Sequence, residues 1–302
     1  MLQACMDALV QEPDGVYVDG TVGGGGHAAA ILEGLNERGR LVGFDRDGEA
    51  IERVSKRLAG DERVSLVHEN FSMMAEVLSE RGVKEVDGVF LDLGVSSFQL
   101  DEAERGFSFQ GDGPLDMRMD RSRGVSAREW IAQTDEREMA DVIYRLGEER
   151  SARRIAQAIC ERREQQPFEM TSDLAEVVER VKGGRRGRRI HPATLTFQAI
   201  RMVVNRELES LERVLADMLL RIRVGGRFVL LTFHSLEDRL VKQFFNRHVQ
   251  REVALQAGGV QIEGERPFVS WVSKKPLMAM EEEMRENPRA RSAKLRVVRV
   301  EG

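Results

Sequence analysis

The sequence predicts an α/β fold in which a parallel sheet is interrupted by an all-helical insertion. Short β-rich runs alternate with helical stretches through the first hundred residues, a pattern typical of βαβ units. The alternation stops after Leu100, where helical patterns follow one another directly, and it resumes with the apolar run 228–233. We therefore expect a sheet domain formed by residues 1–105 and 193–302, with a helical domain inserted at 106–192.

Hydrophobic periodicity predicts the individual elements of the first half. Apolar residues recur at helical spacing between the early β-rich runs, so these stretches are expected to be crossover helices. Gly60 and Gly82 interrupt the pattern and indicate element ends. The expected strands cover residues 16–18, 41–44, 64–67 and 86–91, and the expected helices between them cover 28–37, 49–58 and 73–81.

Helix caps and periodicity extend the prediction through the remaining chain. Ser126 with Glu129 and Asp135 with Glu138 have the spacing of a capping box, which predicts two helix starts. A single long amphipathic helix is predicted at 197–222. Further helices are expected at 151–163 and 172–181, and two late strands, 268–272 and 295–300, are expected to pair antiparallel at the sheet edge.

Composition excludes several classes of protein. With 41% apolar and 32% charged residues, the 302-residue chain is expected to fold as a globular protein. Its longest apolar runs are strand-sized, far below the roughly 20 residues that span a bilayer. The first ten residues lack a basic region followed by an apolar core, so we expect no secretory signal, no membrane partner and a cytoplasmic location.

Charge and cysteine content limit the possible ligands. The net charge of −5 argues against a protein that coats nucleic acid by bulk electrostatics, so any RNA contact must come from local basic patches. Cys5 and Cys160 are far apart and lack metal-ligand spacing. We expect both to be free buried thiols, and we predict no metal site.

A glycine-rich segment follows the first predicted strand. Residues 19–27 read DGTVGGGGH, and glycines let the chain turn tightly while a ligand approaches the backbone. Asp45 ends the second predicted strand, where an acidic side chain commonly accepts hydrogen bonds from ribose hydroxyls. Together these features favour nucleoside binding at the carboxyl edge of the sheet. The alternative is that the glycines form only a flexible turn and that Asp45 or Asp47 caps the next helix.

A second polar cluster, residues 92–97, follows the fourth predicted strand, which should lie beside the first. An acceptor at Asp92 could contact an adenine amine or a substrate amine. No helical pattern follows Asp92, which argues against the alternative that this cluster caps a helix or forms an Asx turn. Nucleoside binding alone leaves open whether the ligand is a dinucleotide or S-adenosylmethionine, since both present a ribose to the same strand end.

Several distinctive motifs occur in order along the chain. They are DGT at 19–21 with GGH at 25–27, DRD at 45–47, DLGVSS at 92–97, RGFSF at 105–109, GPLDMRMD at 113–120, HPAT at 191–194, HSLEDR at 234–239 and NPRARSAKLR at 287–296. With these motifs the chain resembles, over essentially its whole length, the family of bacterial 16S ribosomal RNA cytosine-N4 methyltransferases known as RsmH or MraW.

This resemblance implies a class I (Rossmann-like) methyltransferase fold with a seven-stranded sheet and an inserted helical domain for substrate recognition. It also implies S-adenosylmethionine as cofactor and the N4 amine of a cytidine in the decoding region of 16S ribosomal RNA as acceptor. The expected partner is the assembled small subunit, and a homodimer is one of the oligomeric states left open. By motif position, the family's cofactor residues fall on Gly25, Gly26, His27, Asp45, Phe71, Asp92 and Gln99.

The chemistry of methyl transfer indicates candidate catalytic residues. An in-line displacement from a sulfonium requires mainly that donor carbon and acceptor nitrogen are aligned. Acceptors on the amine protons, for which Asp92, Ser96 and Ser97 are candidates, would return electron density to the nitrogen. His234, after the fifth predicted strand, could orient the base or relay a proton. It could equally cap the next helix by contacting Glu237 or Asp238.

Two basic runs are candidate RNA contacts, although such runs can also be ordinary solvated surface. Phe71 could pack against adenine or belong to the core. The basic runs comprise Lys182, Arg185, Arg186, Arg188 and Arg189, and then Arg289, Arg291, Lys294 and Arg296.

Two other functions compete with this interpretation. A nicotinamide-dependent dehydrogenase would also use the glycines and Asp45, but no residues for hydride transfer are evident downstream. A non-catalytic ribosome-assembly or RNA-binding module would tolerate loss of Asp92.

Overall fold

The computed structural model describes residues 1–185, 187, 190–254 and 260–301. The chain divides into two compact units. The first combines Met1–Gly94 with Glu209–Gly302, and the second is Val95–Leu208. The predicted insertion at 106–192 therefore lies within the second unit, which extends beyond it at both ends.

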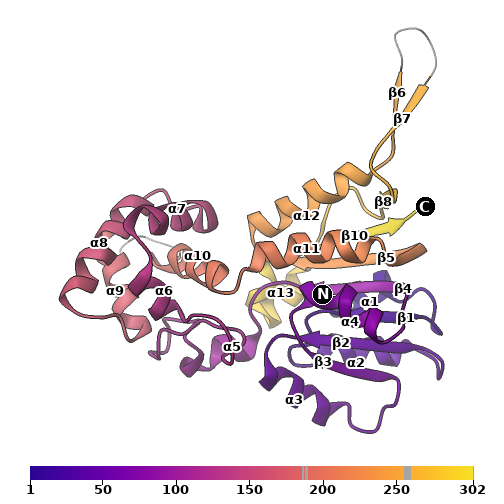
Figure 1. Cartoon of the computed structure of the whole chain (residues 1–302), viewed down its shortest axis with the longest axis horizontal. Helices are drawn as coiled ribbons and strands as arrows, with labels where there is room; N and C mark the ends of the chain where they lie inside the picture. The colour runs from indigo at the N-terminus through magenta and orange to yellow at the C-terminus, as the bar shows by residue number, and fades with distance from the viewer. Residues whose placement is uncertain (186, 188–189, 255–259, 302) are drawn as a thin grey trace. The chain divides into compact units, whose positions relative to one another are not determined.

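A mixed β-sheet forms the centre of the first unit (Figure 1). Its strands are β1 (Val16–Asp19), β2 (Arg40–Asp45), β3 (Val64–His68), β4 (Val86–Asp92), β5 (Ile222–Thr232), β8 (Val269–Trp271), β9 (Leu277–Met278) and β10 (Lys294–Val300). The order is β3-β2-β1-β4-β5-β10-β8, and β9 pairs with β10 in addition. The predicted seven-stranded sheet is confirmed, with β9 as a short further strand.

Strand direction follows the expected pattern. Strands β3, β2, β1, β4 and β5 are parallel to one another, as crossover connections require. Strand β10 runs antiparallel to both β5 and β8, so the predicted antiparallel pairing of the two late strands is confirmed. A separate hairpin is formed by β6 (Arg251–Ala254) and β7 (Val260–Glu263).

Alternating residues of the central strands pack on opposite faces of the sheet. Val89 and Leu91 of β4 belong to one hydrophobic cluster, whereas Phe90 between them belongs to another. The first cluster includes α4 (Met74–Glu80), α11 (Glu207–Leu219) and α12 (Ser235–His248), and the second includes α1 (Leu2–Leu9), α2 (Gly26–Glu33) and α3 (Gly48–Arg57). Helices on both faces leave the strand ends as the accessible edges of the sheet. A further short helix, α13 (Glu281–Glu286), precedes β10.

The second unit has a helical core of its own. Its helices are α5 (Ser97–Asp101), α6 (Ala127–Gln133), α7 (Glu136–Gly147), α8 (Ala152–Gln165), α9 (Thr171–Val181) and α10 (Thr194–Val204). Trp130, Ile143 and Ile155 are among the side chains buried together in it. Ser126 and Glu129 form the predicted capping box at α6, and no strand occurs among the described residues between β4 and β5. The expectation of an all-helical insertion is confirmed.

The prediction of one long helix at 197–222 is wrong. The chain forms α10 and α11 instead, and the break contains Arg206, whose φ is +49°. The side chain of Asn205 explains where α10 ends, because its Nδ2 donates to the carbonyl of Met117 at 2.7 Å and its Oδ1 accepts from the N–H of Met119 at 2.8 Å. These hydrogen bonds hold the end of α10 against a distant loop of the same unit. Periodicity alone cannot predict such a break.

A helix that spans a bilayer must be both long and apolar. Among the described residues, no helix combines the length and the apolarity needed to span a membrane.

Candidate active site at the carboxyl edge of the sheet

Three neighbouring strands each end in an aspartate at the same edge of the sheet. Asp19 is the last residue of β1, Asp45 of β2 and Asp92 of β4. Strands β2 and β4 flank β1, and both pair with it in parallel. The three carboxyl groups therefore gather at the edge where ligands bind in open α/β sheets.

The glycine-rich turn after β1 is hydrogen-bonded to both neighbouring strand ends. The N–H of Gly23 donates to Oδ2 of Asp45 at 2.8 Å, and the N–H of Asp92 donates to Oγ1 of Thr21 at 2.7 Å. Asp19 accepts from the N–H of Thr21 at 2.9 Å. The turn thus holds Asp45 and Asp92 in fixed positions on either side of itself.

Glycine is required in this turn for two different reasons. Gly25 precedes the first residue of α2 and has a φ of +77°, a conformation that residues with a Cβ rarely adopt. At Gly20 a Cβ would lie only 2.2 Å from Cε of Met74 and 2.4 Å from Cδ2 of Leu91. A Cβ at Gly26 would meet nothing within 4 Å, so the start of α2 faces open space. The predicted ligand position Gly26 borders that space, whereas a Cβ at Gly25 would lie 3.1 Å from Cγ2 of Val54.

Burial raises the pKa values of the three carboxyl groups. The pKa rises to about 7 for Asp19 and Asp92 and to about 6 for Asp45, and loss of solvation is the largest cause in each case. The negative charges of Asp92 and Asp45 raise the pKa of Asp19 further, and Glu237 acts in the same way on Asp92. This edge would therefore be stabilised by a ligand that is positively charged or donates hydrogen bonds.

His27 does not neutralise this negative charge at neutral pH. Its Nδ1 lies 3.5 Å from Oδ2 of Asp92, but burial lowers the pKa of the imidazole to about 4. The uncharged ring packs against Phe90 at a centroid distance of 4.6 Å. Oδ2 of Asp19 and Oδ1 of Asp92 are buried and accept no hydrogen bond from the residues that the structure describes. Both atoms thus lack the hydrogen-bond donor that a buried carboxylate oxygen normally has.

Phe71 lies beside the glycine turn. It begins the short 3₁₀ helix η1 (Phe71–Met73) after β3, and a Cβ at Gly20 would be 3.1 Å from its Cβ. Its side chain is half-buried and also packs against the hydrophobic cluster that includes α4. This position is compatible with both interpretations from the sequence, an adenine contact and a core aromatic.

Four residues that support the site were not identified as site residues from the sequence. Asp19 and Thr21 hold the turn, while Arg57 donates to the carbonyl of Gly24 at 2.9 Å and Arg53 to that of Gly23 at 3.5 Å. For Asp19 a signal was present, since it ends its strand as Asp45 and Asp92 do. The two arginines come from α3, and sequence alone does not indicate which way they point.

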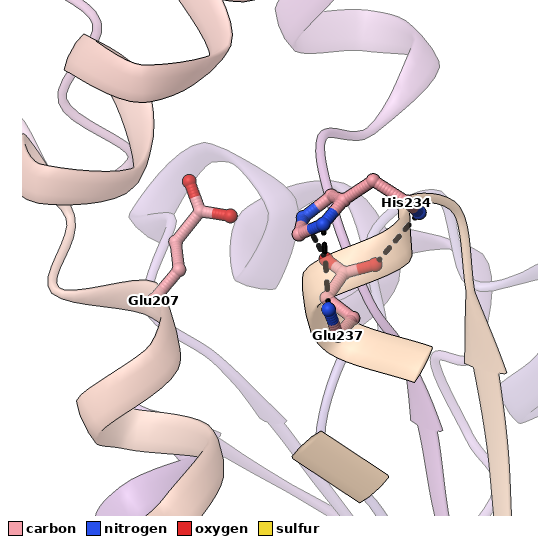
Figure 2. A group of neighbouring side chains, drawn as sticks. All are labelled: Glu207, His234 and Glu237. Carbon is pink, nitrogen blue, oxygen red and sulfur yellow. Dashed lines mark hydrogen bonds and ion pairs between the residues drawn. The ribbon is translucent and has the colours of Figure 1, made fainter. Parts of the chain in front are cut away.

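His234 caps α12. Figure 2 shows its imidazole facing Glu237: Nδ1 accepts from the N–H of Glu237 at 3.4 Å, and Nε2 lies 2.8 Å from Oε1 of the same residue. Glu237 is buried, and its carboxylate accepts in return from the N–H of Phe233 at 2.9 Å. The capping role that the sequence left open is therefore present, and a catalytic role for His234 stays a prediction.

Ser96, Ser97 and Gln99 lie in the second unit, at the start of α5. The hydroxyl of Ser96 accepts from the N–H of Gln99 at 3.2 Å, and Oε1 of Gln99 accepts from the N–H of Ser96 at 3.1 Å. The expectation that no helix follows Asp92 is therefore wrong, because this capping box stabilises a helix too short to show periodicity. Catalytic and cofactor roles for these three residues stay predictions.

The two predicted basic patches are largely engaged in ion pairs where the structure describes them. Arg185 pairs with Glu179 at 2.8 Å, and Lys294 pairs with Asp238 at 3.1 Å. Arg289 and Arg291 are exposed. Arg186, Arg188 and Arg189 lie outside the described residues.

Two other members of these runs also have acidic partners. Lys182 pairs with Glu149, and the buried Arg296 pairs with Asp238 at 2.6 Å. RNA binding by either patch stays a prediction.

Comparison with known families agrees with this arrangement. The model of the MraW methylase family matches residues 1–301. The chain belongs to the MraW methylase family. The resemblance identified in the sequence is thus confirmed.

Individual relatives are similar over almost their full lengths. A protein of Syntrophotalea carbinolica named ribosomal RNA small subunit methyltransferase H is 48% identical over 301 residues, which cover 99% of this chain and 96% of the relative. A protein of the same name from Geotalea uraniireducens is 50% identical over 290 residues, covering 95% of this chain and 93% of the relative. A third, from Syntrophobacter fumaroxidans, is 47% identical over 309 residues and covers 100% and 95% of the two chains.

Proposed function

We propose that the chain transfers a methyl group from S-adenosylmethionine to the exocyclic N4 amine of a specific cytidine in the decoding region of 16S ribosomal RNA. The observation that carries this proposal is the convergence of the glycine turn, Asp45 and Asp92 at one strand edge. The names of the relatives support ribosomal RNA of the small subunit as the substrate class. The N4 position rests on the family resemblance in the sequence.

The residues at this edge fit S-adenosylmethionine. Asp45 accepts one backbone N–H on each carboxylate oxygen, from Gly23 and from Asp47, so each oxygen keeps a lone pair for a ribose hydroxyl. The raised carboxyl pKa values favour a cationic ligand, and the open space beside Gly26 admits one. Phe71, His27 and Gln99 complete the proposed cofactor residues. When bound, the cofactor supplies an electrophilic methyl group on a sulfonium.

The proposed catalysis depends on alignment and on hydrogen-bond acceptors. The lone pair of a cytosine amine is delocalised into the ring, so an acceptor on an amine proton makes the nitrogen more nucleophilic. Oδ1 of Asp92 is buried with no partner among the described residues, which suits it for this role. Ser96 and Ser97 follow closely in sequence and are proposed as further acceptors. Because burial raises the pKa of Asp92 to about 7, this role requires a pH near or above neutrality.

The helical unit is proposed to recognise the RNA. The target base must leave its helix to react, since the amine of a paired cytosine is inaccessible in the narrow major groove of RNA. The proposed phosphate contacts are Arg185 and the three arginines outside the described residues, which belong to the helical unit, together with Arg289, Arg291 and Lys294 of the first unit. The assembled small subunit in the cytoplasm is the proposed substrate, and a homodimer is a further proposal.

Methyl transfer to defined substrates tests the proposed function. Small subunits that lack this modification would be incubated with the chain and labelled S-adenosylmethionine, and their nucleosides would then be analysed. We expect label on the cytidine N4 amine. Label on a ring carbon or a ribose oxygen would refute the amine assignment. The absence of label with both subunits and naked 16S RNA would refute the activity.

A further inference from the structure

A cavity lies at the edge of the same sheet opposite the candidate active site. Its volume is about 550 Å³, and its lining includes the segment before β1, the first residues of β4 and β5, and the last residues of β10. All of these segments belong to the first unit. With a rise of about 3.3 Å per residue, β4 separates this cavity from Asp92 by on the order of 15–20 Å. A ligand here would not touch the candidate active site.

Two arginines lie directly opposite each other in the wall of this cavity. Arg227 of β5 and Arg299 of β10 are paired in the register of these antiparallel strands. Like charges at such positions repel each other and destabilise the pairing. Burial lowers the pKa of Arg227, and the charge of Arg299 lowers it further. The fold therefore keeps two guanidinium groups together against an electrostatic cost.

The arginine pair lacks an adequate acidic partner in the described part of the chain. Arg227 donates from Nη1 to the carbonyl of Ala8 at 2.8 Å, while its Nε is buried with no hydrogen-bond acceptor. Among the residues that the structure describes, the only ion-pair partner of Arg299 is Glu301, whose Oε1 lies 3.9 Å from Nη1 of Arg299.

The buried acid of the same cavity is already engaged elsewhere. Asp87 accepts from the N–H of Val16 at 2.6 Å and pairs with Arg223 at 2.8 Å. The described residues of the cavity therefore do not neutralise the positive charges of Arg227 and Arg299, and an anionic ligand would do so.

We propose that Arg227 and Arg299 bind the phosphate group of a small phosphorylated molecule in this cavity. Guanidinium groups match phosphate oxygens with paired, charge-assisted hydrogen bonds, and a dianion between two arginines would remove their repulsion. The exposed side chains of Glu12 and Asp14 line the same cavity. They disfavour the continuous negative charge of an RNA backbone and can accept hydrogen bonds from hydroxyls of a small phosphate ester.

Calorimetric titration of the full chain tests this site. The probes are inorganic phosphate, cytidine 5′-monophosphate and a single-stranded oligoribonucleotide without terminal phosphates, all at low ionic strength. The test variant is Arg299→Gln, whose residue is 51% exposed and whose loss should leave the fold intact. Arg227→Lys keeps the charge but removes the planar fork. Arg285→Gln, at an exposed residue of α13 outside the cavity, is the matched control.

We expect phosphate and the monophosphate to bind the native chain and the control equally. Arg299→Gln should weaken both at least tenfold, and Arg227→Lys at least threefold, while binding of S-adenosylhomocysteine stays unchanged. The proposal is overturned if phosphate does not bind, or if Arg299→Gln and Arg285→Gln bind it alike. Tighter, Arg299-dependent binding of the oligoribonucleotide than of the monophosphate would overturn the assignment to a small molecule. The phosphate-binding outcomes depend neither on methyl transfer nor on cofactor binding, so they are independent of the proposed function.

Discussion

The two ends of strand β4 carry aspartates in opposite situations. Asp87, near its beginning, is buried, accepts from the N–H of Val16 and pairs with Arg223. Asp92, at its end, has Oδ2 3.5 Å from Nδ1 of the uncharged His27, the negative charge of Glu237 raises its pKa, and its Oδ1 is buried with no hydrogen-bond partner among the described residues. The charged form of the aspartate is thus stabilised at the beginning of β4 and destabilised at its end.

This difference distinguishes a carboxylate that is stabilised within the protein from one that we propose to be functional. A buried carboxylate normally has a cation or several hydrogen-bond donors, because the cost of desolvation is otherwise large. Asp87 meets this condition within the protein. Asp92 would meet it only with a ligand, and this is why its pKa is raised to about 7. The contrast supports the proposed site at the carboxyl edge more strongly than the glycine motif alone does.

The largest expected effect is on methyl transfer after Asp92→Asn. The substitution keeps the shape but removes the carboxylate, and we expect kcat to fall by at least about 100-fold, as for the loss of one strong transition-state contact. Single-turnover rates with small subunits would measure this. Asp87→Asn is the matched control at the other end of β4, and it should retain activity per folded molecule. Equal losses in the two variants would contradict the distinction.

Asp45→Asn should have the next largest effect, on cofactor affinity. The amide retains one acceptor oxygen, but it loses the charge and one of the acceptors proposed for the ribose hydroxyls. We expect the Kd for S-adenosylhomocysteine to rise by about tenfold, equivalent to roughly 1.4 kcal/mol. Fluorescence or calorimetric titration would measure it, with Asp47→Asn at the helix cap as the control. An unchanged Kd would remove Asp45 from the binding site.

Stability should respond to pH differently in Asp92→Asn and in the native chain. The pKa of Asp92 is about 7 when folded and 3.8 in its ordinary state, so between these values the folded state holds the proton more tightly. Native stability therefore falls as pH rises from about 4 to 7, and Asp92→Asn escapes this loss. At pH 8 the variant should be more stable by on the order of 1–3 kcal/mol, and this gain should vanish below pH 4. Urea unfolding at several pH values measures it, and a destabilised variant at pH 8 would disprove the raised pKa.

His234→Asn should have the smallest effect. Asparagine is a good N-cap residue, so the stability should change by less than about 0.5 kcal/mol, whereas His234→Ala should cost about 1 kcal/mol. If capping is the whole role of His234, methyl transfer by His234→Asn should stay within threefold of the native rate. A loss of more than tenfold in a variant of native stability would show that the imidazole acts in catalysis.

The sequence predicted the parts of the site that depend on position along a strand. Asp45 and Asp92 were identified because each follows a short apolar run, and parallel pairing brings such ends together. The helical insertion was likewise evident from the loss of alternation after Leu100. Both inferences use patterns local to the chain.

What the sequence did not reveal depends on contacts between distant segments. The end of α10 is set by Asn205 bonding to residues 86 and 88 positions away. The Arg227–Arg299 pair exists only through the register of β5 and β10. The pKa values of the three aspartates depend on burial that no motif specifies. Such features require the folded arrangement.

Calorimetric titration of the native chain with S-adenosylhomocysteine and, separately, with NAD tests the central claim most directly. If the glycine turn, Asp45 and Asp92 form the binding site of a methyl donor, S-adenosylhomocysteine will bind with one-to-one stoichiometry and NAD will give no heat. Binding of NAD without binding of S-adenosylhomocysteine would contradict the account.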